Sequence, residues 1–226
     1  MKKIWLHTLL TTVITGTFLV PVVHAHQKGD ILLRAGVTIV APDDSSSHII
    51  AGADLGLGVR VDSNAQLGIN VAYFVSDKWN VELLAATPFS HDIDFGATDP
   101  LGTGNQLGVT KHLPPTLTAN YYFAGSAEYF QPYVGIGLNY TVFFDEKFTN
   151  ANADAGLTGL TLDDSFGLSA QIGADYIINE EVLLNASVRY IDIETDAKFN
   201  LGETAGSIAT VSIDPWVYTL SIGYAF

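Results

Sequence analysis

The chain has 226 residues, of which 48% are hydrophobic and 15% are charged, whereas about 25% of the residues in soluble domains carry a charge. This length fits one domain or one barrel. Beyond the N-terminal leader, no segment contains the roughly 18 unbroken apolar residues of a membrane helix. The formal net charge of −14 argues against a nucleic-acid partner. The chain has no cysteine, which fits a fold closed by hydrogen bonds in an oxidising compartment.

The N-terminus has the pattern of a secretory leader. Lys2 and Lys3 precede a threonine-rich apolar run over residues 4–20, and Ala25 supplies a small residue for cleavage. We therefore predict a signal peptide over residues 1–25 and a mature chain over 26–226. Its net charge is −16, because the leader holds two lysines and no acidic residue. An uncleaved membrane anchor is the alternative, but the threonine and glycine residues lower its apolarity.

Eight segments of the mature chain alternate large apolar residues with small or polar ones, and period two predicts strands. They cover residues 30–40, 66–75, 79–86, 115–123, 132–144, 165–177, 182–190 and 216–226. The last segment has a large apolar or aromatic residue at every second position from Trp216 to Phe226. Ten residues tilted by about 40° rise roughly 25 Å, the height of the apolar band of an outer-membrane barrel.

The connections between these segments alternate in length. Long ones cover residues 41–65, 89–113, 145–164 and 192–207, and short ones cover 76–78, 124–131 and 179–181. Membrane barrels place short turns in the periplasm and long loops outside. The spacing therefore predicts three periplasmic turns, four extracellular loops and, because the strand number is even, two periplasmic termini. The glycine-rich run at 49–61 is a candidate to extend the strands as a hairpin.

The outward faces decide between a membrane and a soluble barrel. Each predicted outward face is aliphatic or aromatic, while charged residues lie in loops, turns or inward positions. A soluble barrel would show the reverse. We predict an all-β fold, an eight-stranded antiparallel transmembrane barrel in the outer membrane of a Gram-negative bacterium, in contact with lipid and lipopolysaccharide. Tyr224 and Phe226 resemble the terminal signal that the barrel-assembly machinery recognises.

The sequence resembles the OmpW family of small outer-membrane proteins. The segments that carry the resemblance are VELLAATPFSHDI at 81–93, KHLPPTLTANYYF at 111–123, PYVGIGLNYTVFFD at 132–145 and DPWVYTLSIGYAF at 214–226, with RAGVTIVAP near the start. They span the mature chain in order. The resemblance implies a narrow, largely apolar lumen, uptake of small hydrophobic molecules and, for some members, a role as phage or bacteriocin receptors.

Side chains largely fill an eight-stranded barrel, so a wide water pore is not expected. The inward positions that we assign to the lumen are Arg34, Gly36, Asn120, Asn139, Gln171, Asp175 and Arg189. The inward glycines either leave space for a conduit or relieve crowding between strands. Arg34 and Arg189, with Asp175 and Glu82, are predicted to form a buried ion network that plugs the floor. A plugged floor would force a solute to leave sideways.

Pro88 is the candidate for such a sideways exit. Proline cannot donate to a strand ladder, so it belongs at an edge, a bulge or a strand end. In the resembled family, a proline at this place is linked to a gap in the barrel wall. The hypothesis is that Pro88 and Phe89 help to open a lateral exit into the outer leaflet. Ordinary strand termination is the alternative explanation. The aromatic constriction of the family's lumen cannot be placed from the sequence, since residues 145–164 contain Phe148 but no tryptophan.

Two groups of reactive residues have simpler explanations. His91, Asp92, Asp94 and His112 fit no strong metal-ligand spacing, so we expect no metal or other cofactor. Ser90, His91 and Asp92 are adjacent, and adjacent strand residues point to opposite faces. The chain also has no G-x-S-x-G motif. We therefore expect no enzyme activity.

Two functions follow from these patterns. The first is passive uptake of small hydrophobic molecules through a narrow lumen with lateral release. The second is a non-conducting surface barrel with a structural role or a role as a phage or bacteriocin receptor. A filled lumen with disordered loops would favour the second.

Overall fold

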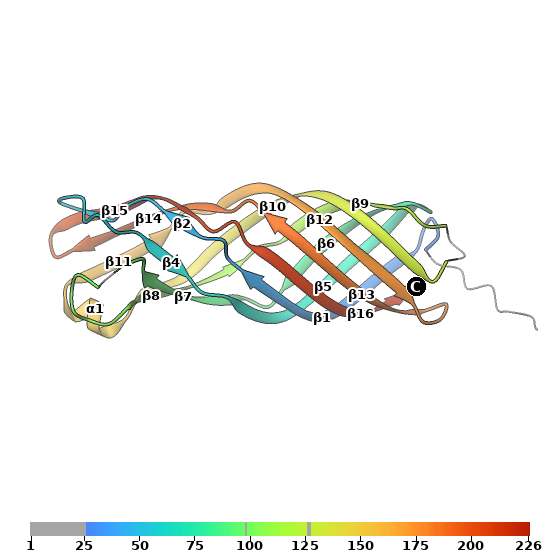
Figure 1. Cartoon of the computed structure of the whole chain (residues 1–226), viewed down its shortest axis with the longest axis horizontal. Coiled ribbons are helices and arrows are strands. Elements are labelled where there is room, and N and C mark those ends of the chain that lie inside the picture. Colours follow the sequence, from blue (N-terminus) through green and yellow to red (C-terminus); the bar gives the residue numbers. More distant parts are fainter. Residues whose placement is uncertain (1–25, 98, 126–127) are drawn as a thin grey trace, which may run out of the picture.

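The computed structural model describes residues 26–97, 99–125 and 128–226 and shows one long barrel (Figure 1). The leader predicted at 1–25 lies outside the described residues. Eight antiparallel strands follow one another around the wall, and β10 pairs with β12 to close it. They are β1 (Ile31–Ala41), β5 (Asn64–Ser76), β6 (Trp79–Ala86), β9 (Thr116–Tyr122), β10 (Phe130–Phe148), β12 (Ser165–Ile177), β13 (Val182–Ile191) and β16 (Trp216–Ala225). The eight predicted strands are confirmed.

The alternation in the sequence sets which side chains face outward. On β16, the exposed residues are Trp216, Tyr218, Leu220, Ile222 and Tyr224, and the residues between them are largely buried. Aromatic pairs lie near both ends of the apolar band. Trp79 packs against Tyr121 at the short-turn end, and Tyr190 packs against Trp216 at the opposite end, with ring centroids 5.0 and 5.4 Å apart. Aromatic residues at both edges of an apolar band are typical of strands that cross a bilayer.

The four long connections, which the sequence analysis predicted as loops, are built largely of further strands. They form β2 (Ser45–Ser46), β3 (Ile50–Ala51), β4 (Val59–Val61), β7 (Phe89–Phe95), β8 (Gln106–Leu113), α1 (Asn150–Asp154), β11 (Leu157–Leu162), β14 (Glu194–Leu201) and β15 (Thr204–Ser212). These elements continue the barrel lengthwise, at the end away from the C-terminus (Figure 1). We call this part the extension.

The extension forms because its strands also alternate, but with polar outward residues. On β7, the inward residues are Phe89, His91, Ile93 and Phe95, and the outward ones are Ser90, Asp92 and Asp94. β4, β7, β8 and the end of β10 pair in one sheet, while β11, β14, β15 and β2 pair in another. β10 therefore extends beyond its predicted end at Phe144. A bulge between Phe144 and Lys147 keeps its pairing with β8.

Two apolar clusters lie at opposite ends of the interior. The larger one fills the extension and includes Val59, Ile93, Phe143, Phe199 and Ile208. The smaller one lies near the termini around Phe74, Tyr122 and Leu183. Among the described residues, no helix has the length and apolarity needed to cross a membrane. The interior between the two clusters is polar, and this division positions the candidate site.

Candidate functional site

Charged side chains close the half of the barrel that is nearer the C-terminus. We call this half the lower half, and the extension lies at the upper end. Arg34 Nη1 lies 2.6 Å from Glu82 Oε2, and Arg34 Nη2 lies 2.6 Å from Asp175 Oδ2. Arg189 Nη2 lies 2.7 Å from the other oxygen of Glu82, and its Nε donates to Gln171 Oε1 over 3.0 Å. We call these five residues the floor network. It confirms the predicted network of buried ions.

The floor network is balanced in charge and well supplied with hydrogen bonds. It joins two guanidinium and two carboxylate groups, all at most 4% exposed. Tyr122 donates its hydroxyl to Asp175 over 2.9 Å, Asn185 donates to the other Asp175 oxygen over 2.7 Å, and His26 Nε2 lies 3.0 Å from Asp175 Oδ2. Buried charges are tolerated when they are paired and hydrogen-bonded in this way. The alternation of the sequence identified the charges but not the roles of Tyr122, Asn185 and His26.

At the level of the floor network and above it, the lumen is lined by uncharged polar side chains. Asn120 donates to Asn80 over 2.8 Å, and Asn139 donates to Thr116 over 3.0 Å. Other buried residues in this polar section are Thr38, Asn70, Thr118, Thr141, Ser169, Thr219 and Ser221. The membrane-spanning lumen is therefore polar, in contrast to the largely apolar lumen implied by the family resemblance.

The inward glycines relieve crowding between strands. A Cβ placed on Gly36 would lie 2.1 Å from the backbone oxygen of Leu220, and one on Gly137 would lie 2.4 Å from that of Leu117. At Gly223 the space is taken by Leu183 and Arg34. These glycines permit close packing, and the alternative that each leaves open space is not supported at these positions.

The apolar part of the interior lies in the extension. A cavity of about 230 Å³ near the tip is lined by apolar residues, among them Leu101, Phe148 and Phe199. A second cavity of about 30 Å³ lies deeper, and Leu107, Leu160 and Ile208 line both. We call the two cavities the upper chamber. The rings of Phe148 and Phe199 meet edge to face here, with centroids 5.9 Å apart.

A layer of rings closes the lower end of the upper chamber. His91 and His112 stack with centroids 4.8 Å apart, Phe89 stacks on His112 at 5.5 Å, and Phe143 meets His112 edge-on at 5.8 Å. We call these four residues the aromatic layer. Burial lowers the pKa of His91, and burial together with the neighbouring His91 lowers the pKa of His112 to about 3. Both imidazoles are therefore neutral at ordinary pH.

The barrel wall is interrupted beside this layer. Pairing between β6 and β9 stops at Leu84 and Thr116, and pairing between the next two strands resumes at Phe89 and His112. Residues 85–88 and 113–115 lie between, and they contain Pro88, Pro114 and Pro115. Each of these prolines lacks the N–H that a ladder needs. The sequence analysis singled out Pro88 but not the two prolines that face it, although the KHLPP segment contains them.

The other side of Pro88 is also interrupted. Gly68 pairs with Ala86 below Pro88, and Val61 pairs with Ile93 above it, in the same register. The ladder is thus interrupted locally without a shift of register. Pro88 is exposed, whereas the Phe89 side chain is 1% exposed and turns inward. Phe89 therefore covers the inner side of the gap.

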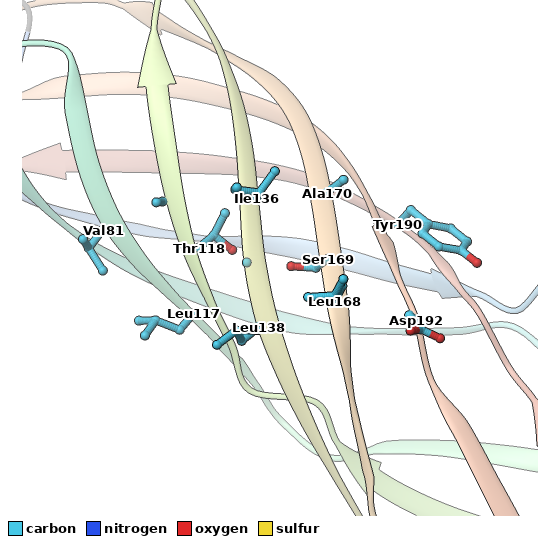
Figure 2. A pocket seen from close by; sticks show the side chains of 12 residues that line it. Val81, Leu117, Thr118, Ile136, Leu138, Leu168, Ser169, Ala170, Tyr190 and Asp192 are labelled. Carbon is cyan, nitrogen blue, oxygen red and sulfur yellow. The ribbon is translucent and has the colours of Figure 1, made fainter.

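A shallow groove of about 910 Å³ runs over the outer wall at β9, β10 and β12 (Figure 2). Leu117, Ile136, Leu138 and Leu168 line it, and all four are at least 49% exposed. Its apolar lining faces outward, so it belongs to the lipid-facing surface and not to the lumen.

The remaining reactive residues are separated by the alternation of β7. His91 is buried, whereas Ser90 and Asp92 are exposed on the other face. His112 lies beside His91, but Asp92 and Asp94 do not face them. At the chain end, Tyr224 and Phe226 lie outward with ring centroids 4.7 Å apart, and their role in assembly stays a prediction.

The comparisons with known proteins agree with this architecture. The model of the OmpW family matches residues 27–226. Outer membrane protein W of Vibrio cholerae is 47% identical over 204 residues, covering 90% of this chain and 92% of that protein. Outer membrane protein W of Escherichia coli is 43% identical over 229 residues and the full length of both chains.

A solved structure supports the same fold. The crystal structure of OprG from Pseudomonas aeruginosa superposes with a TM-score of 0.83 at 42% identity, covering 89% of this chain and 98% of that one. The family model, the sequence relatives and the barrel together show an outer-membrane protein of a Gram-negative bacterium, and the chain belongs to the OmpW family.

Proposed function

We propose that this barrel passively admits small hydrophobic molecules through the upper chamber and releases them sideways beside Pro88 into the outer leaflet. The observation that carries the proposal is the change of lining along the interior. The upper chamber is apolar, but the section below the aromatic layer is polar and ends at the buried ions of the floor network. An apolar solute gains nothing by descending further.

The gap in the wall supports the direction of release. It lies at the level of the aromatic layer, where the apolar path ends, and three prolines interrupt the hydrogen bonding there. Outside the gap, the surface changes from apolar residues such as Val81 and Leu83 to polar ones such as Ser90 and Asp92. The gap therefore opens near the upper edge of the apolar band. A rotation of the Phe89 ring would uncover it.

Replacing Pro88 tests the release step. In Pro88→Ala the restored N–H can bridge the gap, so uptake of labelled decane by whole cells should fall toward the level of cells without the protein. Pro42→Ala, the same change outside the gap, should leave uptake unchanged when surface levels are matched. Equal uptake by the two variants would exclude a role for Pro88 in release.

We also propose that both termini face the periplasm and that lipid and lipopolysaccharide surround the band. The start of β1 lies beside the C-terminal residue, since Ile31 and Phe226 exchange backbone hydrogen bonds of 3.3 and 2.9 Å. They lie at the short-turn end, away from the polar extension (Figure 1). The outer groove over β9, β10 and β12 suits an acyl chain. An epitope tag in the turn at Gly202–Glu203 should be accessible to antibody on intact cells, and a tag after Phe226 should not.

A second candidate function is a non-conducting surface barrel. The acidic outward residues of the extension, such as Asp92 and Asp94 on β7, favour it, because they offer a charged surface to a partner. The filled floor suits either function, whereas the ordered strands and the upper chamber differ from the filled barrel with disordered loops expected for a receptor. If wild-type cells took up decane no faster than cells without the protein, the receptor function would be the better one.

A further inference from the structure

Two buried nitrogen atoms of the aromatic layer border the narrow end of the upper chamber. They are Nε2 of His91 and Nε2 of His112, in side chains that are 1% and 2% exposed, and neither has a hydrogen-bond partner among the described residues. Both residues line the 30 Å³ cavity, and their rings are within 2° of parallel. Buried polar atoms without partners are rare and costly. Two of them side by side indicate a place for a ligand's polar group.

The hydrogen bonding of His91 defines what its free nitrogen can do. Its Nδ1 lies 2.6 Å from the backbone oxygen of Asp62, and a carbonyl oxygen can only accept. Nδ1 therefore carries the proton in the neutral ring, and Nε2 presents a lone pair as an acceptor. No hydrogen bond among the described residues fixes the tautomer of His112, so its Nε2 can carry a proton. The pair can thus offer one acceptor and one donor.

The surroundings limit the ligand to a single uncharged polar group. Apart from Thr110 and the two histidines, the 30 Å³ cavity is lined by apolar residues such as Val61, Ile93 and Leu162. The chamber above it is also apolar. A carboxylate would find no cation here, since the imidazoles are neutral and Asp62 Oδ1 lies only 3.7 Å from His91 Nδ1. A hydroxyl group both donates and accepts, and so matches the pair.

We infer that His91 and His112 bind the hydroxyl head of a medium-chain alcohol, with its hydrocarbon tail extending upward into the apolar cavity. The hydroxyl donates to Nε2 of His91 and accepts from Nε2 of His112. The aromatic layer then prefers molecules with one uncharged polar group and a hydrocarbon tail over plain alkanes, at the level of the wall gap. This inference rests on the proposed function, because it takes the upper chamber as the path of the solute.

Binding can be measured without transport. The protein would be labelled with ¹⁵N-histidine, placed in lipid nanodiscs and titrated with 1-decanol, decane or decanoate. Decanol should shift the Nε2 resonances of His91 and His112 in a saturable way, while decane and decanoate should not. His48 is the internal control, because its Nδ1 bonds to Asp54 on the exposed surface. Unchanged resonances of the pair, or equal shifts at His48, would overturn the inference.

Uptake then tests selectivity. The double variant His91→Phe/His112→Phe keeps stacked rings but loses both Nε2 atoms. The ratio of decanol uptake to decane uptake should therefore fall about tenfold, as expected for one or two lost hydrogen bonds. His48→Phe should keep the preference. A double variant with the wild-type preference would contradict head-group binding. Decane uptake no faster than in cells without the protein would instead remove the proposed function, and the nanodisc titration would still report on binding.

Discussion

The residues of the floor network show how charge can be placed inside a membrane barrel. Arg34 contacts both Glu82 and Asp175, and Arg189 contacts Glu82, so each charge has a partner of opposite sign. The gain from such pairing is small compared with an apolar core, but the loss of one partner is costly because it leaves a buried charge uncompensated. The network is therefore sensitive to single substitutions.

Replacement of Glu82 tests this sensitivity. Glu82→Gln removes one negative charge and leaves the buried Arg189 without a carboxylate partner, so the free energy of unfolding should fall by about 3–5 kcal/mol. Guanidinium-induced unfolding in lipid vesicles measures the change. Glu203→Gln, at the exposed turn between β14 and β15, is the matched control and should unfold like the wild type. Similar midpoints for the two variants would show that the network contributes little to stability.

At the scale of the element, β6 and β7 form one continuous path in which Pro88 separates two environments. Below it the outward residues are apolar, and above it they are polar. The inward residues change in the opposite sense, from Glu82 to Phe89 and Ile93. Both faces change polarity at the same residue. Outside, lipid faces β6 and water faces β7. Inside, β6 faces the polar lumen and β7 faces the apolar upper chamber.

The β7–β8 hairpin should respond to acid. Burial lowers the pKa of His91 and His112 below 6.5, the latter to about 3. As the pH falls from 6.5 toward 3, the unfolded hairpin gains protons that the folded one excludes, so stability is lost in this window. Nearby charged groups are Asp62 and Asp92 at His91 and outward-facing Lys111 on β8.

Hydrogen exchange of the hairpin amides would measure the effect. Amides of β7 and β8 should exchange faster relative to intrinsic rates at pH 4 than at pH 7, while those of β1 and β16 change less. In His91→Phe/His112→Phe this difference between the hairpin and the barrel should vanish. If the variant kept the difference, other groups would have to explain the loosening.

At the scale of the whole molecule, the barrel has a polar closed half and an apolar upper half. Ions cannot cross the floor network without breaking buried ion pairs, and water would not fill the apolar upper chamber readily. In planar bilayers the protein should therefore show little ion conductance while cells that carry it take up decane. Glu82→Gln is expected to raise the conductance, because it loosens the floor. High conductance of the wild type with passage of polar solutes would make it a small porin.

The strands of the membrane-spanning part could be predicted because each carries its own signal. Alternation of apolar and small residues, together with the changing lengths of the connections, identified eight strands and their faces. The inward charges Arg34, Glu82, Asp175 and Arg189 were also visible, because an ion on an otherwise uncharged inward face must find a partner. These properties depend on near neighbours in the chain and on the bilayer around it.

The extension and the candidate site required the tertiary structure. β7, β8, β14 and β15 are bordered by glycine and acidic residues that also suit loops, and they become strands because they pair with one another and cover a shared apolar interior. Pro88 was recognisable in the sequence, but Pro114 and Pro115 face it only through the pairing of β6 with β9. His91 and His112 are 21 positions apart, and only the register of β7 and β8 stacks their rings. The sequence by itself thus determined the barrel and its place in a membrane, because period two repeats along each strand. The tertiary structure decided where the apolar path ends, because that depends on which distant side chains meet inside the barrel.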